Sequence, residues 1–128
     1  AMLKETVICV IIVVSIFSLD MFTQNYTNKI TKDITKIFAE LKELAIEENK
    51  DKIDKKITEL DEMWNKKHDK LACYIEHDEL EKVDTAIVSA KSYIQTEDYS
   101  SAASEFDVGK FVLEHIQEKY KFNLVNVF

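Results

Sequence analysis

The chain has 128 residues with one glycine and no proline, and 46% of its residues are apolar and 32% charged. This composition excludes collagen-like, disulfide-stapled and mostly disordered classes, and so few turn residues predict long helices joined in one domain. The net charge of −7 is uneven, since residues 71–128 hold 5 Lys and 11 Asp+Glu, whereas residues 23–70 hold 11 of each. Because this acidic half has no arginine, we expect no nucleic-acid partner.

Residues 7–19 form an uncharged apolar run that is rich in β-branched side chains. Its 13 residues are fewer than the about 20 that cross a bilayer, but residues 3–22 reach that length once the flanking apolar residues are counted. Residues 17–20 supply no small-residue cleavage site, so we expect an uncleaved signal anchor that contacts the membrane through residues 3–22. The alternative interpretation is a core helix of a soluble oligomer, which the shortness of the run favours.

The flanking charge predicts an orientation for this anchor. Lys4 precedes the run, and acidic residues count little in the positive-inside rule, so we expect the N-terminus inside and the rest of the chain outside the cell membrane. The sequence then divides into a single-pass transmembrane helix over residues 1–22 and a helical bundle domain over residues 23–128.

From residue 25 onward, apolar residues recur at helical spacing and predict four amphipathic helices. The first carries an a/d seam at Ile30, Ile34, Ile37, Leu41 and Leu44. The stripes of the other three helices are Ile53, Ile57, Leu60, Trp64 and Leu71; Leu80, Val83, Ile87, Ala90 and Ile94; and Tyr99, Ala102, Ala103, Phe106, Leu113 and Ile116.

Turn signals divide these helices at residues 49–51 and 96–98, with a softer break at residues 74–78. We expect Asp51 to cap the second helix, and Thr96 or Asp98 to cap the fourth. The predicted fold is all-α, an N-terminal hydrophobic helix followed by a small antiparallel bundle of two helical hairpins. Stacked solenoid repeats are the weaker alternative, because the two hairpins share little sequence identity.

The fourth helix is apolar on two faces, since Val108, Phe111 and Val112 lie opposite its main stripe. This pattern predicts a central or interface position. Gly109 costs about 1 kcal/mol against alanine in mid-helix, so we expect a neighbouring helix to approach it closely. Five of the seven residues in the tail, 122–128, are apolar, and we expect the tail to pack back on the bundle.

One stretch, residues 76–84, combines a histidine with several carboxylates. On a helix, His77, Glu81 and Asp84 stand at i, i+4 and i+7, where an imidazole and two carboxylates can hold a divalent metal or transfer a proton. His115 would complete the set in an antiparallel hairpin. The alternative is a solvated helix face whose early carboxylates favour the helix dipole.

Cys9 and Cys73 lie in regions of different character, and no metal-binding cysteine spacing occurs. We interpret them as small buried residues, and the alternative is an intermolecular disulfide through Cys9 in a dimer. The sequence contains no specific Ser/His/Asp or Cys/His set and no glycine-rich phosphate loop, so we expect no enzymatic activity and no cofactor beyond that divalent metal.

Several segments, in their order along the chain, resemble a known family: the apolar N-terminus, the Trp64 helix, and residues 77–84, 93–98, 111–116 and 126–128. The chain resembles the domain-of-unknown-function family number 4363, small proteins of low-GC Gram-positive bacteria without an assigned activity. The resemblance implies an N-terminally membrane-anchored helical protein. Its family-like positions are Trp64, His77, Asp84, Glu114, His115 and Asn126. Gln117 stands where the family commonly has a proline, which leaves open how sharply the fourth helix ends.

Together these observations predict a membrane-anchored extracytoplasmic helical protein that acts in protein–protein interaction or assembly. Its partner is another protein or a second copy of the chain in a homo-oligomer. The alternative function is a metal-binding or sensor domain that uses the histidine–carboxylate cluster.

Overall fold

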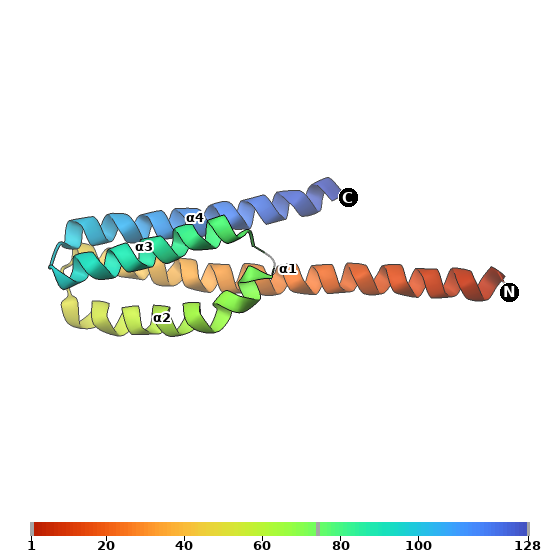
Figure 1. Cartoon of the computed structure of the whole chain (residues 1–128), viewed down its shortest axis with the longest axis horizontal. Helices are drawn as coiled ribbons and strands as arrows, with labels where there is room; N and C mark the ends of the chain where they lie inside the picture. Colours follow the sequence, from red (N-terminus) through yellow and green to blue (C-terminus); the bar gives the residue numbers. More distant parts are fainter. Residues whose placement is uncertain (1, 74, 128) are drawn as a thin grey trace.

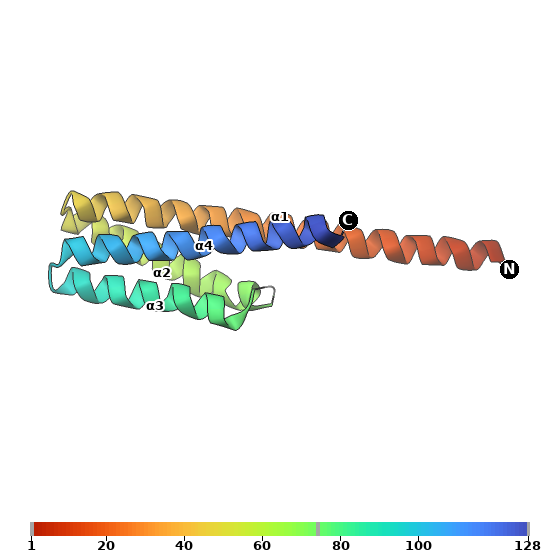
Figure 2. The same cartoon turned by 90° about the horizontal axis from the view of Figure 1, so that it is seen from above.

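The computed structural model describes the backbone of residues 2–73 and 75–127, and the side chains of residues 2–22, 25–73 and 75–119. Its helices are α1 (Met2–Ile46), α2 (Lys50–Ala72), α3 (His77–Gln95) and α4 (Tyr99–Val127). Successive helices run in opposite directions, and α1 extends well beyond the other three at its N-terminal end (Figures 1 and 2). The all-α class and the antiparallel bundle are therefore confirmed.

The apolar N-terminal run and the first bundle helix form one continuous helix of 45 residues. The described side chains from Met2 to Phe22 are exposed, whereas burial begins at Thr27 and continues along the predicted seam from Ile30. No glycine or proline interrupts this helix, so its hydrogen bonds continue where the composition changes. The boundary expected at residue 22 thus falls inside α1, and no flexible linker separates the run from the bundle.

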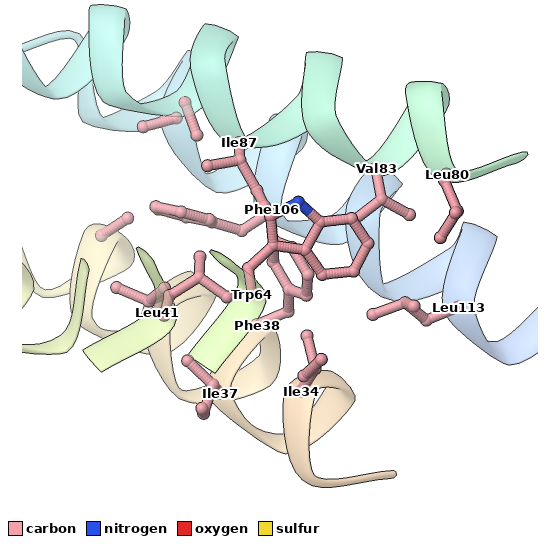
Figure 3. Close-up of a cluster of buried hydrophobic side chains, with 14 of the residues drawn as sticks. Ile34, Ile37, Phe38, Leu41, Trp64, Leu80, Val83, Ile87, Phe106 and Leu113 are labelled. Atoms are coloured by element: carbon pink, nitrogen blue, oxygen red, sulfur yellow. The ribbon is translucent and has the colours of Figure 1, made fainter. Parts of the chain in front are cut away.

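The four helices surround one core (Figure 3). The largest interfaces join α4 to α1 and to α3, α2 packs on α1, and α2 and α3 touch least. Trp64 reaches from α2 into the middle of the core, where apolar side chains from the other three helices surround it (Figure 3). The five predicted core residues of α3 are all buried, and Phe38 joins the core beside the predicted seam of α1.

Gly109 lies at a close approach between α1 and α4. A Cβ atom added at this position would lie 2.8 Å from Cε1 of Phe38, well inside van der Waals contact. Phe38 is fully buried, and its ring centroid lies 6.4 Å from that of Phe106. The expected close approach of a neighbouring helix to Gly109 is therefore confirmed.

The two tight corners of the bundle contain no glycine, and a glutamate takes the left-handed backbone conformation at each. Glu48 follows α1 with a φ of 57°, and Glu97 follows α3 with a φ of 59°. At the second corner, the Glu97 N–H donates to Ile94 O at 3.1 Å and the Asp98 N–H donates to Tyr93 O at 2.9 Å. These are the hydrogen bonds of a Schellman ending, which normally favours glycine at this position.

The helix caps agree with the sequence only in part. Asn49, not Asp51, caps α2, because the helix already begins at Lys50; the Asn49 side chain accepts a hydrogen bond from the Lys52 N–H at 3.3 Å. At α4, Asp98 accepts from the Ser101 N–H at 3.2 Å, as one of the two expected alternatives.

The C-terminal part of α4 differs from the expectation for the tail. The backbone continues as one helix to Val127 instead of turning back over the bundle (Figure 1). Gln117 keeps the backbone N–H that a proline would lack, so the helix has no break there. The side chains of the tail, including Asn126, lie outside the described residues.

Both cysteines are free and exposed, so the expectation that they are buried is wrong. Cys9 lies on the exposed apolar part of α1, and Cys73 lies at the C-terminal end of α2. The dimer through Cys9 stays a prediction.

Candidate functional site

The predicted histidine–carboxylate cluster does not come together as one site. His77 is the first residue of α3, its side chain is 86% exposed, and its Nε2 lies 4.0 Å from Oε2 of Glu81. An exposed pair at this distance contributes little to stability and holds neither side chain in place. Asp84, two turns further along α3, contacts α2 instead.

Asp84 belongs to a polar cluster with Trp64 and His68, which we call the seam cluster because it joins α2 to α3. The Trp64 Nε1–H donates to Oδ1 of Asp84, and Oδ2 of Asp84 lies 3.4 Å from Nε2 of His68. The Trp64 and His68 rings meet edge to face with their centroids 5.5 Å apart. Since Trp64 is only 4% exposed, its indole N–H needs an acceptor, and Asp84 supplies it.

The seam cluster is part of how α2 and α3 hold together. Their interface is the smallest in the bundle, and a second polar contact crosses it, in which Lys91 Nζ donates to Oδ2 of Asp61 at 2.6 Å. The sequence contained a signal for the cluster that our reasoning missed. Trp64 and His68 are four residues apart, so an N–H donor and an imidazole share one helix face and need a partner on the next helix.

His115, the fourth predicted ligand, is exposed on α4. Oε1 of its neighbour Glu114 lies 3.9 Å from Nζ of Lys110 on the same helix. Among the residues that the structure describes, no group of three or more His, Cys, Asp or Glu side chains is placed to hold a metal ion. The metal hypothesis for His77 and its expected partners therefore stays a prediction.

A second charged cluster ties the beginning of α3 to α4. Lys119 Nζ lies 3.2 Å from Oε1 of Glu76 and 3.5 Å from Oε1 of Glu79, and the hydrogen bond to Glu76 is the main cause that raises the pKa of Lys119. Glu79 is 9% exposed, and its other oxygen accepts no hydrogen bond from the described residues. The sequence alone gave no sign of this cluster, because Lys119 lies 40 residues from Glu79.

A groove between α3 and α4 combines apolar and acidic side chains. Its volume is about 600 Å³, and it is lined by Asp78, Glu81, Lys82, Thr85, Ala86, Glu105, Val108 and Val112. Three carboxylates, one lysine and three apolar side chains are among these residues, so the groove carries an excess of negative charge. Val108 is 47% exposed, and Phe111 on the same helix is 69% exposed. The second apolar face of α4 is therefore not covered by the described part of this chain.

Another groove, of about 640 Å³, lies between α1 and α2, and its charges balance. Four lysines and four glutamates line it, and Lys56 bridges Glu40 on α1 and Glu59 on α2. The hydrogen bond to Glu40 is the main cause that raises the pKa of Lys56. Because the charges of its lining residues cancel, this groove attracts a charged segment less than the α3–α4 groove does.

The N-terminal part of α1 is long and apolar enough to cross a membrane, by length and composition. None of this part is buried against the rest of the described chain. Two apolar surfaces are therefore left uncovered by the described part of the chain: the N-terminal part of α1, and the exposed face of α4 beside the α3–α4 groove.

Comparison with known proteins identifies a family but not an activity. No curated protein and no solved structure matches the chain. One family model, described as Domain of unknown function (DUF4363), matches residues 21–127. The match begins at the end of the apolar run and extends through all four helices, including the positions of Trp64, His77, Asp84, Glu114 and His115. Since it covers most of the chain, the resemblance seen in the sequence is confirmed, and the chain belongs to the DUF4363 family of unknown function.

Proposed function

We propose that this protein is a membrane-anchored, extracytoplasmic helical bundle that binds another protein through the groove between α3 and α4. The observation that carries the proposal is the exposed apolar part of α1. Residues 3–22 rise about 30 Å at 1.5 Å per residue, which equals the thickness of the hydrocarbon core. Burying one large apolar side chain is worth about 1.5–3 kcal/mol, so a bilayer stabilises this unburied run strongly.

The continuous α1 sets how the bundle stands on the membrane. The corners at residues 47–49 and 96–98 lie at the end of the bundle far from the apolar run, whereas the end of α2 and the beginning of α3 lie near the run (Figure 1). Because the continuous α1 contributes both the anchor and six of the 21 buried core residues, no flexible tether connects the bundle to the membrane.

The charge of the α3–α4 groove indicates the chemistry of its partner. A groove lined by apolar side chains and by more carboxylates than lysines complements a helix that has apolar residues on one face and lysine or arginine on the other. Two copies of this chain that met through this groove would bring these carboxylates together, which opposes a symmetric dimer on this face. We therefore expect a basic amphipathic segment of a different protein.

Cys73 offers a direct test of the anchor and its orientation. It is exposed on the bundle, whereas Cys9 lies within the apolar run. Lys4 before the run supports a bundle outside the cell, but Lys29 and Lys32 follow the run, so the labelling decides the orientation. A membrane-impermeant maleimide added to intact cells should label the membrane-bound full-length protein, and Cys73→Ser should abolish the label. Labelling only after lysis would place the bundle inside, and full-length protein in the soluble fraction would overturn the anchor.

Partner binding is tested with a photo-crosslinking amino acid at Val108 in native membranes, with Thr58 on the exposed face of α2 as the matched position. We expect an adduct from Val108 that maps to a lysine- or arginine-rich segment of another membrane-associated protein. The double change Glu81→Lys and Glu105→Lys should remove it. Equal adducts at Thr58, an adduct to a second copy of this chain, or insensitivity to the charge reversal would each contradict the proposal.

A further inference from the structure

Tyr26, four residues beyond Phe22 on α1, lies against two lysines of α2. Lys67 Nζ donates to the Tyr26 hydroxyl at 3.2 Å and lies 5.5 Å from the ring centroid, and Lys70 Nζ lies 5.7 Å from the same centroid. The hydrogen bond from Lys67 is the main cause that lowers the pKa of Tyr26. These contacts fix the last turns of α2 against α1 at the height of Tyr26.

That height corresponds to the headgroup layer of a membrane that holds the apolar run. Four residues of helix place Tyr26 about 6 Å beyond Phe22, and the headgroup layer is about 5–7 Å thick on each side. Since α2 runs antiparallel to α1, its residues after Lys67 descend further toward the membrane (Figure 1). The ammonium groups of Lys67 and Lys70 both lie beside the Tyr26 ring, at that height.

The end of the bundle near the apolar run has a divided charge. The α1–α2 side, residues 25–32 and 66–73, carries one aspartate, Asp69, and five lysines: Lys29, Lys32, Lys66, Lys67 and Lys70. The α3–α4 side, residues 76–82 and 114–119, carries two lysines and six carboxylates: Glu76, Asp78, Glu79, Glu81, Glu114 and Glu118. We call these the basic half and the acidic half.

The lysines of the basic half are available to a ligand. Four are exposed and Lys67 is half-buried, and none of the five forms an ion pair with another described side chain, whereas Lys119 of the acidic half is held by Glu76 and Glu79. A tyrosine at a membrane boundary with two lysines of the next helix beside its ring is suited to the interface, since the ring is amphipathic and the ammonium groups reach the phosphate layer.

We propose that the basic half binds the anionic headgroups of the phospholipids around α1, with Tyr26 positioning Lys67 and Lys70 at the phosphate layer. This inference rests on the membrane anchor proposed above. Each lysine near an anionic surface strengthens binding by roughly fivefold. The three lysines at the end of α2, Lys66, Lys67 and Lys70, should therefore give a measurable preference for anionic over zwitterionic lipids. The acidic half is repelled by the same surface, so the side that binds lipid is fixed.

The test uses the full-length protein in vesicles of phosphatidylcholine with a minor fraction of phosphatidylglycerol. Spin-labelled lipids report which headgroup is enriched around the protein. We expect phosphatidylglycerol to be enriched at least about threefold over phosphatidylcholine, and high salt to reduce the enrichment through screening. The variant Lys66→Gln/Lys67→Gln/Lys70→Gln should lose the selectivity, and the charge-preserving triple arginine variant should keep it.

A matched control lies on the same helix. Lys50, Lys52 and Lys55 are exposed at the far end of α2, and their triple change to glutamine removes the same charge without touching the basic half. This control should keep the wild-type selectivity. If the control variant loses selectivity equally, or if wild-type protein in the vesicles shows no enrichment, the lipid-binding inference is wrong while the anchor stands. If the full-length protein does not float with pure phosphatidylcholine vesicles, the anchor and the inference both fail.

Discussion

Replacing Gly109 with alanine tests whether the packing of α1 against α4 has room for one more methyl group. In an open helix, Gly→Ala would stabilise the protein by about 1 kcal/mol through helix propensity. Here the new Cβ would lie 2.8 Å from Cε1, 2.9 Å from Cζ and 3.2 Å from Cδ1 of Phe38. Carbon atoms pack at about 3.5–4.0 Å, so the helices or the ring must move by close to 1 Å.

The ring has little space to move, because Phe38 is fully buried and lies against Phe106 at the largest interface of the bundle. Overpacking of this kind costs about 1–3 kcal/mol, which exceeds the gain in helix propensity. We therefore expect Gly109→Ala to lower the free energy of unfolding by about 1 kcal/mol net.

The measurement is urea unfolding of the full-length protein in detergent micelles, followed by the fluorescence of Trp64, which is 4% exposed in the folded state. The same Gly109→Ala change in a Phe38→Leu background separates the two effects. Leucine removes the ring atoms that the methyl group meets, so alanine should there be neutral or stabilising by up to about 1 kcal/mol. A stabilising effect in the wild-type background, or an equal loss in both backgrounds, would refute the reasoning.

Glu97→Gly should raise the urea midpoint, because relief of the left-handed conformation (about 1–2 kcal/mol) exceeds the added entropy cost of glycine (about 0.5–1 kcal/mol); an unchanged or lower midpoint would contradict this. Asp84→Ala leaves the indole N–H of Trp64 without its acceptor and should cost about 1–3 kcal/mol, whereas Asp84→Asn, which keeps an acceptor, should cost less; equal losses would argue against the seam cluster. The pKa of Lys56 is raised by Glu40 from its ordinary value of 10.5, so the stability it contributes is present below that value and is lost as pH rises through the raised pKa. Lys56→Met should therefore flatten the alkaline loss of the melting temperature, and an unchanged slope would count against the pair. Because His77, Glu81 and Asp84 do not converge in this structure, adding Zn²⁺ or Mn²⁺ should leave the melting temperature unchanged; a rise that a chelator reverses would support the metal hypothesis for His77.

The features that the sequence predicted correctly are those that depend on the residues of a single helix. The stripe of α3 from Leu80 to Ile94 is buried at every predicted position, because a 3.6-residue period alone defines one face. Gly109 was interpretable for the same reason, since an unfavourable residue in mid-helix needs a local cause. The family match adds no residue roles, and the pairing of Trp64 and His68 with Asp84 is visible only in the folded structure.

What could not be predicted depends on pairing between helices or on the continuity of the backbone. Helical spacing places Asp84 on the same side of α3 as His77 and so predicts that they interact. In the structure Asp84 instead accepts a hydrogen bond from the N–H of Trp64 on α2. A buried N–H without an acceptor costs more free energy than an exposed imidazole without one, so this pairing is favoured. The composition change near residue 22 suggested a boundary. Backbone hydrogen bonds do not depend on side-chain polarity, so α1 continues through it.

That continuity relates the groove to the proposed anchor. Asp78 and Glu81 lie in the first turns of α3, at the end of the bundle that faces the apolar run (Figure 1). The proposed anchor therefore places this end of the α3–α4 groove close to the bilayer. The continuous α1 keeps it there, because no linker separates the apolar run from the bundle. If the basic half binds anionic headgroups as proposed, the same headgroups repel the acidic half, and the groove stays clear of lipid on the opposite side. A basic amphipathic segment that reaches this groove must itself lie close to the membrane surface, which favours the juxtamembrane part of another membrane protein over a soluble partner.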